Sequence, residues 1–96
     1  MTYQLKISSY AIEQINNAAD WFEKEKEGLG GLFVEDLFKS IDIIHLNPFL
    51  FQKRYKSFRI KFLDKFRFGI HYRIDGKTIF VMAVFHTAQS DDNWFK

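Results

Sequence analysis

The N-terminal half of the chain has the hydrophobic spacing of one strand followed by two helices. Tyr3, Leu5 and Ile7 alternate with polar residues, which predicts a short strand with one buried face. Two stretches with apolar residues at helical spacing follow, and the second ends at Asn47-Pro48. The first stripe contains Ile12, Ile15, Ala18, Ala19 and Phe22, and the second contains Phe33, Val34, Leu37, Phe38, Ile41 and Ile44.

The residues that flank these stretches limit both helices. Ser8 or Ser9 can cap the first helix, and Gly28 can end it near Glu27 by adopting a left-handed conformation. The second helix stops at Asn47, because a residue that precedes proline is pushed out of the helical region. The short connection between the two helices predicts an antiparallel helical hairpin.

The C-terminal half has the pattern of a β-meander. Residues 58–62 and 66–73 alternate apolar with polar positions, and residues 79–85 form a continuous apolar run. Asp75-Gly76, between the last two strands, is a strong hairpin-turn signal. We therefore expect a two-layer α+β domain, ordered β-α-α-β-β-β, with the helical hairpin packed on one face of a small, mainly antiparallel sheet.

Turn lengths predict the face of the sheet on which each side chain lies. A two-residue turn at Asp75-Gly76 pairs Ile74 with Lys77. A three-residue loop at 63–65 sets Phe62 opposite Phe66, which keeps one face apolar. The buried face is then expected to hold Phe58, Ile60, Phe62, Phe66, Phe68, Ile70, Tyr72, Ile79, Val81, Ala83 and Phe85. The open face is expected to hold Arg59, Lys61, Arg67, His71, Arg73, Phe80, Met82, Val84 and His86. Eight of the twelve phenylalanines thus belong to the predicted core, namely Phe22, Phe33, Phe38, Phe58, Phe62, Phe66, Phe68 and Phe85.

The composition is that of one small domain over residues 1–96. The chain is 47% apolar and 27% charged, and it has no cysteine for a disulfide or a thiolate site. Its longest apolar run, residues 79–85, is far shorter than the roughly 20 residues of a membrane helix. The first residues lack the basic and apolar regions of a signal peptide. We expect a cytoplasmic protein without membrane contact.

Charge is distributed unevenly along the chain. Residues 1–50 hold four Lys/Arg and eight Asp/Glu, a balance of −4, while residues 51–96 hold ten and four, a balance of +6. Such a basic half suggests an anionic partner, either nucleic acid or an acidic protein. The predicted open face combines these cations with apolar side chains, which is typical of an interaction surface. The candidate partner-binding residues are Arg59, Lys61, Arg67, His71, Arg73, Phe80, Met82 and His86.

Motifs for nucleotide binding, zinc proteolysis and serine hydrolysis are missing from the sequence. Three histidines, with no cysteine and no carboxylate at ligand spacing, predict neither a metal site nor a cofactor. A ribonuclease that works without metal would still need a base and cations on the open face. His86, Arg73 and His71 are the candidates for such a catalytic set, with neutral His86 as the base.

Six blocks, in order along the chain, carry a resemblance to a known family. They are residues 8–22, Gly28-Leu29-Gly30 with Phe33 and Leu37, Ile44-x-x-Asn47-Pro48-x-x-Phe51, Arg59, residues 66–72, and residues 81–86 followed by Trp94. These blocks resemble the RelE/ParE superfamily of bacterial toxins and are most similar to its ParE branch. The resemblance covers nearly the whole chain and implies a RelE-like fold, a helical hairpin on a small antiparallel sheet.

The resemblance implies the toxin of a type II toxin–antitoxin module. Such a toxin is a cytoplasmic growth inhibitor, associated with plasmid stabilization, and a cognate antitoxin neutralises it in a heteromeric complex. We expect the C-terminal segment of the antitoxin to lie along the fold, with its acids against the basic stretch. ParE-like members poison DNA gyrase, whereas RelE-like members cut mRNA on the ribosome.

Departures from both branch patterns keep three functions open. RelE-like nucleases tend to have arginines where this chain has Gly69 and Thr87, and a tyrosine where it has Asn93-Trp94. ParE-like toxins end in a pattern resembling His-x-x-Arg-x-Pro, where this chain has Gln89 and Asp91. The alternatives are a toxin that poisons DNA gyrase, which the resemblance favours, a ribosome-dependent mRNA endoribonuclease, and a non-toxic member that retains antitoxin binding.

Overall fold

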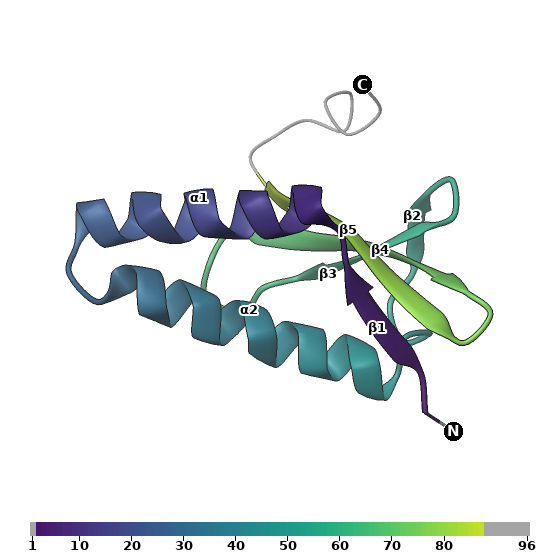
Figure 1. Ribbon diagram of the computed structural model, residues 1–96. Helices are drawn as coiled ribbons and strands as arrows, with labels where there is room; N and C mark the ends of the chain where they lie inside the picture. The colour runs from purple at the N-terminus through teal and green to yellow at the C-terminus, as the bar shows by residue number, and fades with distance from the viewer. Residues whose placement is uncertain (1, 88–96) are drawn as a thin grey trace.

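Two helices and a five-stranded sheet make up the computed structural model, which describes residues 2–87 (Figure 1). The helices are α1 (Ser9–Glu25) and α2 (Leu29–Leu46). The strands are β1 (Gln4–Ile7), β2 (Lys53–Tyr55), β3 (Phe58–Phe62), β4 (Phe68–Asp75) and β5 (Thr78–His86). Met1 and residues 88–96, which include Gln89, Asp91, Asn93 and Trp94, lie outside the described residues.

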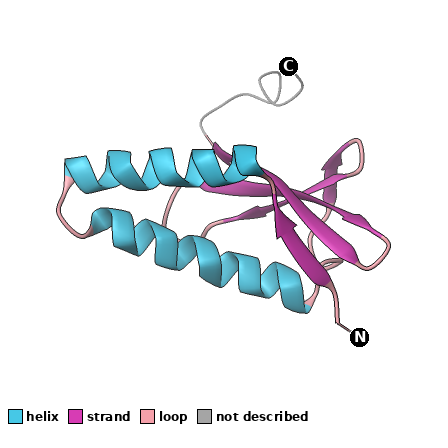
Figure 2. Ribbon diagram, viewed as in Figure 1, coloured by secondary structure: helices cyan, strands magenta, loops and turns pink. Residues whose placement is uncertain are grey.

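The strands lie in the order β1-β5-β4-β3-β2. β1 pairs parallel with β5, and the other neighbours pair antiparallel. The two helices lie side by side and pack against one face of the sheet (Figure 2). The predicted α+β architecture is confirmed, with β2 as an additional strand at the edge. Its length of three residues is too short for the alternation of apolar and polar positions to reveal it.

The turn between the helices is fixed by a carboxylate and two glycines. Glu23 accepts hydrogen bonds from the backbone N–H groups of Gly28 and Gly30, at 2.9 and 3.0 Å. Gly28 has a φ of 86°, the left-handed conformation that the sequence predicts. A Cβ at Gly30 would lie 2.6 Å from the carbonyl oxygen of Ala19, so only glycine lets α2 approach α1 this closely. α1 ends two residues before the predicted limit, and α2 ends at the predicted Asn47.

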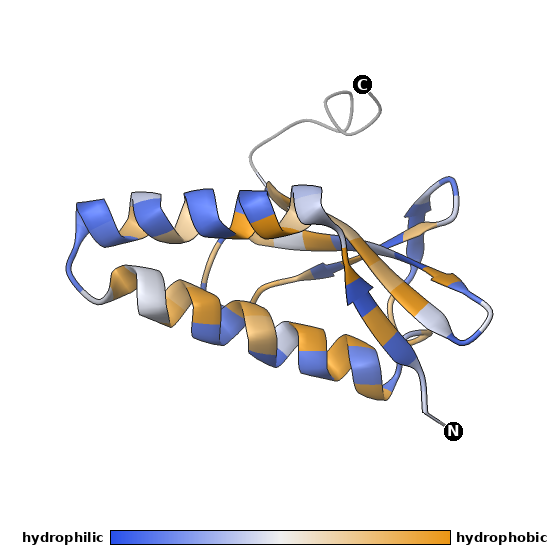
Figure 3. Cartoon of the chain, in the orientation of Figure 1, coloured by the Kyte–Doolittle hydropathy of each residue, from blue (hydrophilic) through white to orange (hydrophobic). Residues whose placement is uncertain are grey.

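Aromatic rings fill the space between the hairpin and the sheet. Phe22 of α1 and Phe33 of α2 contact Phe66 and Phe68, with ring centroids between 4.9 and 5.4 Å apart for three of these pairs. Aliphatic side chains from α1, α2, β4 and β5 complete the core. Most of the exposed residues of α1 are polar, as its blue residues show in Figure 3. Edge-to-face contacts of this kind stabilise the fold beyond the burial of apolar area.

The pairing of β4 with β5 differs by two residues from the predicted register. Asp75 pairs with Thr78 and Ile74 with Ile79, so the turn residues are Gly76 and Lys77 rather than Asp75 and Gly76. Gly76 has a φ of 60°, which explains why glycine stands at the first turn position. A shift of two positions leaves every side chain on its face, because side chains alternate with a period of two.

A bulge in β5 overturns the predicted faces of its second half. Tyr72 pairs with Val81 but His71 pairs with Ala83, so Met82 is an extra residue in β5. Val84, predicted on the open face, therefore packs in the core. The corrected order places Val84 and His86 on the helix-covered face, and Ala83 and Phe85 on the open face.

The N-cap residue of α1 and a side chain from the helix hold the backbone around this bulge. Beyond Val81, β5 has no β1 neighbour along this edge. Ser8 Oγ donates to the Met82 carbonyl at 3.0 Å, and it accepts from Ala11 N–H as the predicted cap of α1. Gln14 Oε1 accepts from Val84 N–H at 2.7 Å. The N-cap of α1 and one side chain of the helix thus replace the missing strand as hydrogen-bond partners.

The register of β3 against β4 also differs from the prediction. Phe62 lies opposite Gly69 rather than Phe66, and Ile60 lies opposite His71. Because the difference is an odd number of positions, every side chain of β3 changes face. The corrected faces place Arg59 and Lys61 on the helix-covered side, and Phe58, Ile60 and Phe62 on the open side.

The loop between β3 and β4 gives the physical reason for this register. Leu63 packs in the core and donates its N–H to Phe68 C=O at 2.9 Å, which leaves residues 64–67 as the loop. Asp36, buried on α2, accepts from Lys65 N–H at 2.8 Å. Phe66 then turns back between Phe22 and Phe33. Tertiary contacts of the loop therefore override the three-residue connection.

The predicted aromatic core is accordingly only half correct. Phe22, Phe33, Phe66 and Phe68 pack as expected. Phe58, Phe62 and Phe85 lie on the open face of the sheet, and Phe38 is 44% exposed on α2. The open face is thus richer in aromatic rings, and poorer in cations, than the sequence predicted.

We predict that Gln14→Leu lowers the free energy of unfolding by about 1–3 kcal/mol, because the part-buried Val84 N–H loses its acceptor. Gln14→Glu retains an acceptor oxygen and should cost less. Urea unfolding followed by circular dichroism measures both, with Asn17→Leu, at an exposed position of α1, as the control. Equal stability of Gln14→Leu and the wild type would show that this hydrogen bond does not hold the bulge.

Candidate functional site

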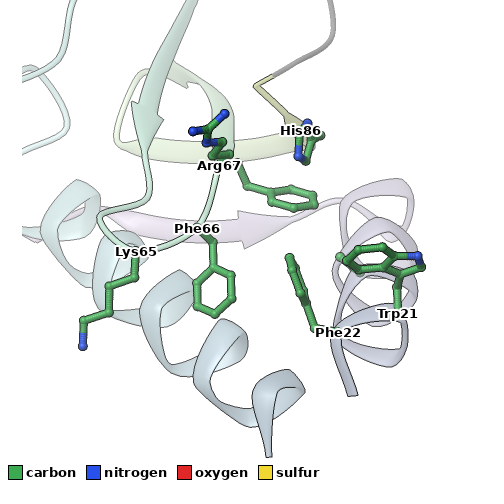
Figure 4. Close-up of a pocket in the computed structure, with 8 residues that line it drawn as sticks. Trp21, Phe22, Lys65, Phe66, Arg67 and His86 are labelled. Carbon is green, nitrogen blue, oxygen red and sulfur yellow. The ribbon is translucent and has the colours of Figure 1, made fainter. Parts of the chain in front are cut away.

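A pocket with an aromatic floor opens between α1 and the ends of β4 and β5 (Figure 4). Its volume is about 490 Å³, within the range of about 300–1,000 Å³ that is usual for binding sites. Eight residues line it, namely Ala18, Trp21, Phe22, Lys65, Phe66, Arg67, Phe68 and His86. We refer to it below as the α1–β5 pocket.

The core of the domain and the floor of this pocket share side chains. Phe22 contacts Phe66 and Phe68 on the inner side, and the ring of Trp21 lies 5.1 Å from that of Phe22 on the outer side. Trp21 is 58% exposed, which is unusual for so large an apolar side chain. His86 comes to the pocket from β5, with its ring 5.2 Å from that of Phe68. It lies there because the bulge at Met82 turns it to the helix-covered face.

Two cations stand at the mouth of the pocket. Lys65 and Arg67 belong to the loop 64–67, and their charged ends point away from the aromatic floor (Figure 4). Both residues are exposed. Lys61 and Arg73 have carboxylate partners, Asp64 and Asp75, each at 3.6 Å. Within residues 2–87, no carboxylate forms an ion pair with Lys65 or Arg67.

The open face of the sheet contains a buried histidine. His71 is 1% exposed, and its Nδ1 lies 2.8 Å from the Tyr55 hydroxyl. The rings of Tyr55 and Phe85 lie 5.7 and 4.9 Å from its own. Burial lowers the pKa of His71 to about 4, and burial also raises the pKa of Tyr55. His71 is therefore neutral at physiological pH.

Comparison with known proteins identifies the family of this chain. The family model described as the ParE toxin of the type II toxin–antitoxin system parDE matches residues 5–91. The chain belongs to the ParE toxin family. A solved structure titled "Chromosomal ParDE TA system from P. aeruginosa" matches with a TM-score of 0.79 and 16% sequence identity, covering 88% of this chain and 96% of that one. At this identity the likeness shows a shared fold. No protein of curated function matches the sequence.

The structure separates the partner-binding residues that were predicted to share one basic face. Arg67 and His86 line the α1–β5 pocket, and Met82 is the extra residue of the bulge. His71, Arg73 and Phe80 lie on the open face. Arg73 stacks its guanidinium 4.7 Å from the centre of the Phe80 ring. The continuous basic surface expected of this ParE-family chain is therefore not formed.

Two cations that were predicted to contact a partner, Arg59 and Lys61, instead make contacts within the domain. Arg59 donates to the Phe51 carbonyl at 2.6 Å, and its guanidinium lies 5.2 Å from the centre of the Phe49 ring. Lys61 is 8% exposed and donates from Nζ to the Phe62 carbonyl at 2.6 Å. Arg59 therefore stabilises the segment between α2 and the sheet, and Lys61 stabilises the end of β3.

The three predicted catalytic residues do not converge. His71 and Arg73 lie on the open face, whereas His86 lies on the helix-covered face. A Cβ on Gly69, where RelE-like nucleases tend to have arginine, would lie 3.0 Å from Ile60 and 3.3 Å from Phe62. Residues 2–87 contain no cluster of three or more histidine, aspartate or glutamate side chains that could hold a metal ion. No helix in this part of the chain is long and apolar enough to cross a membrane.

Sequence reasoning missed six of the eight pocket residues as candidates, all except Arg67 and His86. Trp21 offered a signal, because it flanks the apolar stripe of α1 and is too large to be left in water without a reason. Phe66 and Phe68 gave no such signal, because an aromatic residue at the base of a pocket follows the same sequence pattern as one in the core.

We predict that His71 makes the domain less stable in acid. Its pKa is lowered on folding, so its contribution is present above the unfolded value near 6.5 and is lost as pH falls toward 4. The loss approaches about 3 kcal/mol at the low end. Urea unfolding at pH 7.0, 5.5 and 4.5 measures it. His71→Asn, which does not titrate, should flatten the slope over this range, and an unchanged slope would contradict the assignment.

Proposed function

We propose that this chain is the toxin of a type II toxin–antitoxin module, that it inhibits growth by poisoning DNA gyrase, and that a cognate antitoxin neutralises it. The observation that carries the proposal is the match of the ParE toxin family model to residues 5–91. The proposed target places the toxin in the cytoplasm. Growth inhibition then depends on binding another protein, without a chemical step by the toxin itself.

The placement of the polar side chains supports binding rather than RNA cleavage. A metal-free ribonuclease needs a base, an acid and phosphate-binding cations within hydrogen-bond reach of one phosphate. His86 is separated from His71 and Arg73 by the sheet. His71 is buried against Tyr55 and Phe85, with its Nδ1 at the Tyr55 hydroxyl. The two histidines therefore cannot share one substrate phosphate.

Expression of the chain without an antitoxin in a bacterial host tests the proposal. We expect growth arrest with filamentation and DNA breaks, and with purified gyrase we expect accumulation of the cleaved DNA complex. Cuts in mRNA with arrest of translation would instead indicate the ribosome-dependent nuclease. Unhindered growth would indicate the non-toxic, antitoxin-binding member. Either of the last two results would overturn the gyrase proposal.

We predict that His86→Ala and Arg73→Ala each leave growth arrest within about tenfold of the wild type, because neither belongs to a shared catalytic set. Loss of a general acid or base costs roughly 10²–10⁴-fold in rate. Dose–response curves of growth against inducer, normalised to the amount of toxin, separate the two cases. A loss of two or more orders of magnitude in either variant would restore the catalytic interpretation.

A further inference from the structure

Four apolar side chains are exposed together at the C-terminal end of α2. Leu46, the last residue of the helix, is 86% exposed, and Phe49 and Leu50 of the following turn are 56% and 59% exposed. Ile43, about one helical turn before Leu46, is 37% exposed. Single exposed apolar residues are ordinary, whereas neighbouring ones indicate a surface that another molecule covers. We refer to these four residues as the α2 patch.

The segment that carries the α2 patch is held from the core side. The buried Tyr72 donates its hydroxyl proton to the Pro48 carbonyl at 2.7 Å. The ring of Phe49 lies edge-on to that of Tyr3, with centroids 6.2 Å apart, and the Arg59 guanidinium lies 5.2 Å from its centre. The patch is therefore formed before a partner binds, which lowers the entropic cost of association.

An acid from α2 and a base from β2 border the α2 patch. Asp42 is exposed and lines the same surface pocket as Leu46. Lys53 is exposed on β2 and pairs with Arg59, whose guanidinium lies at the Phe49 ring. Within residues 2–87, neither Asp42 nor Lys53 forms an ion pair. Both charges are therefore available to a partner that covers the patch.

A second copy of the chain matches both the apolar centre and these two charges. At a two-fold axis the same surface of each copy meets, so the surface must be complementary to itself. The four residues of the α2 patch carry no charge, and the patch has one acidic and one basic border. A two-fold axis through it sets Asp42 of each copy beside Lys53 of the other. Nucleic acid, in contrast, would meet the carboxylate of Asp42 together with a single cation.

We propose that the chain forms a two-fold symmetric dimer through the α2 patch, with Asp42 of each copy paired to Lys53 of the other. None of these residues lines the α1–β5 pocket, so the two surfaces are separate. Because only a few side chains of each copy make the contact, we expect a weak dimer, with a dissociation constant of about 10–100 μM. Dimer formation does not depend on the cellular target of the toxin.

Sedimentation of the full chain, from about 1 μM to about 500 μM, measures the association. Leu46→Ser removes the most exposed apolar contact and should weaken the dimer at least about tenfold. Leu32→Ser is the matched control, because Leu32 is 55% exposed on α2 and lies roughly 21 Å along the helix from Leu46. Both side chains are exposed, so both variants should fold, and urea unfolding curves verify this.

Two charge variants test the pairing across the two-fold axis. Asp42→Lys and Lys53→Asp should each weaken self-association, because each places like charges at both contacts. Mixed in equal amounts, the two variants should associate about as tightly as the wild type, since each contact then joins a lysine to an aspartate. Glu35→Lys, at an exposed position of α2 outside the patch, makes the same change of charge as a control and should leave association unchanged.

Several results would overturn the dimer. A chain that stays monomeric at about 500 μM would do so, as would equal weakening by Leu46→Ser and Leu32→Ser. Charge variants that do not rescue each other when mixed would rule out the two-fold arrangement. Loss of growth arrest in Leu46→Ser, with a wild type that remains monomeric, would assign the patch to a different protein partner. Because sedimentation needs no toxicity, a chain that does not arrest growth would refute the proposed function while leaving the dimer intact.

Discussion

The arrangement of this domain depends on how the edge of β5 is completed where β1 stops. Beyond Val81 the strand has no β1 neighbour on that side. Ser8, the N-cap of α1, and Gln14 of α1 form hydrogen bonds with Met82 and Val84 instead. A backbone N–H left without a partner in this half-buried position would be costly. The same two contacts hold the backbone on either side of the bulge, and they fix α1 above the end of the sheet. The bulge at Met82 thus determines where α1 packs on the sheet. It also determines the face on which the last residues of β5 lie.

The pocket follows from that arrangement together with the loop between β3 and β4. The bulge brings His86 to the helix-covered side, and Asp36 draws the loop toward α2, so that Phe66 turns into the core. Between the loop and α1, the aromatic core reaches the surface at Trp21. The pocket is therefore the exposed end of the core rather than a separate patch. This makes the surface rigid, since its floor is held by the contacts that hold the fold.

Charge in the basic half of the chain serves two different purposes. Arg59 holds the Phe51 carbonyl in the segment that joins α2 to the sheet, and Lys61 holds the Phe62 carbonyl at the end of β3. Arg73 packs on Phe80 beside Asp75. Lys65 and Arg67, which stand at the pocket, have no ion-pair partner among residues 2–87. Counting the cations in a stretch of sequence therefore overestimates how many of them are available to a binding partner.

The sequence by itself determined both helices, four of the five strands, their order and the family of this protein. Helical spacing, the Ser8 cap, Gly28 and Asn47-Pro48 act through neighbouring residues, so their effects can be predicted locally. Only the tertiary structure decided which face each residue of β3 and the end of β5 occupies, and hence which residues meet at the pocket. Alternation fixes the two faces of a strand relative to each other, but the choice of buried face depends on register. Here register depends on contacts such as the one between Gln14 and Val84, which are 70 positions apart in the chain.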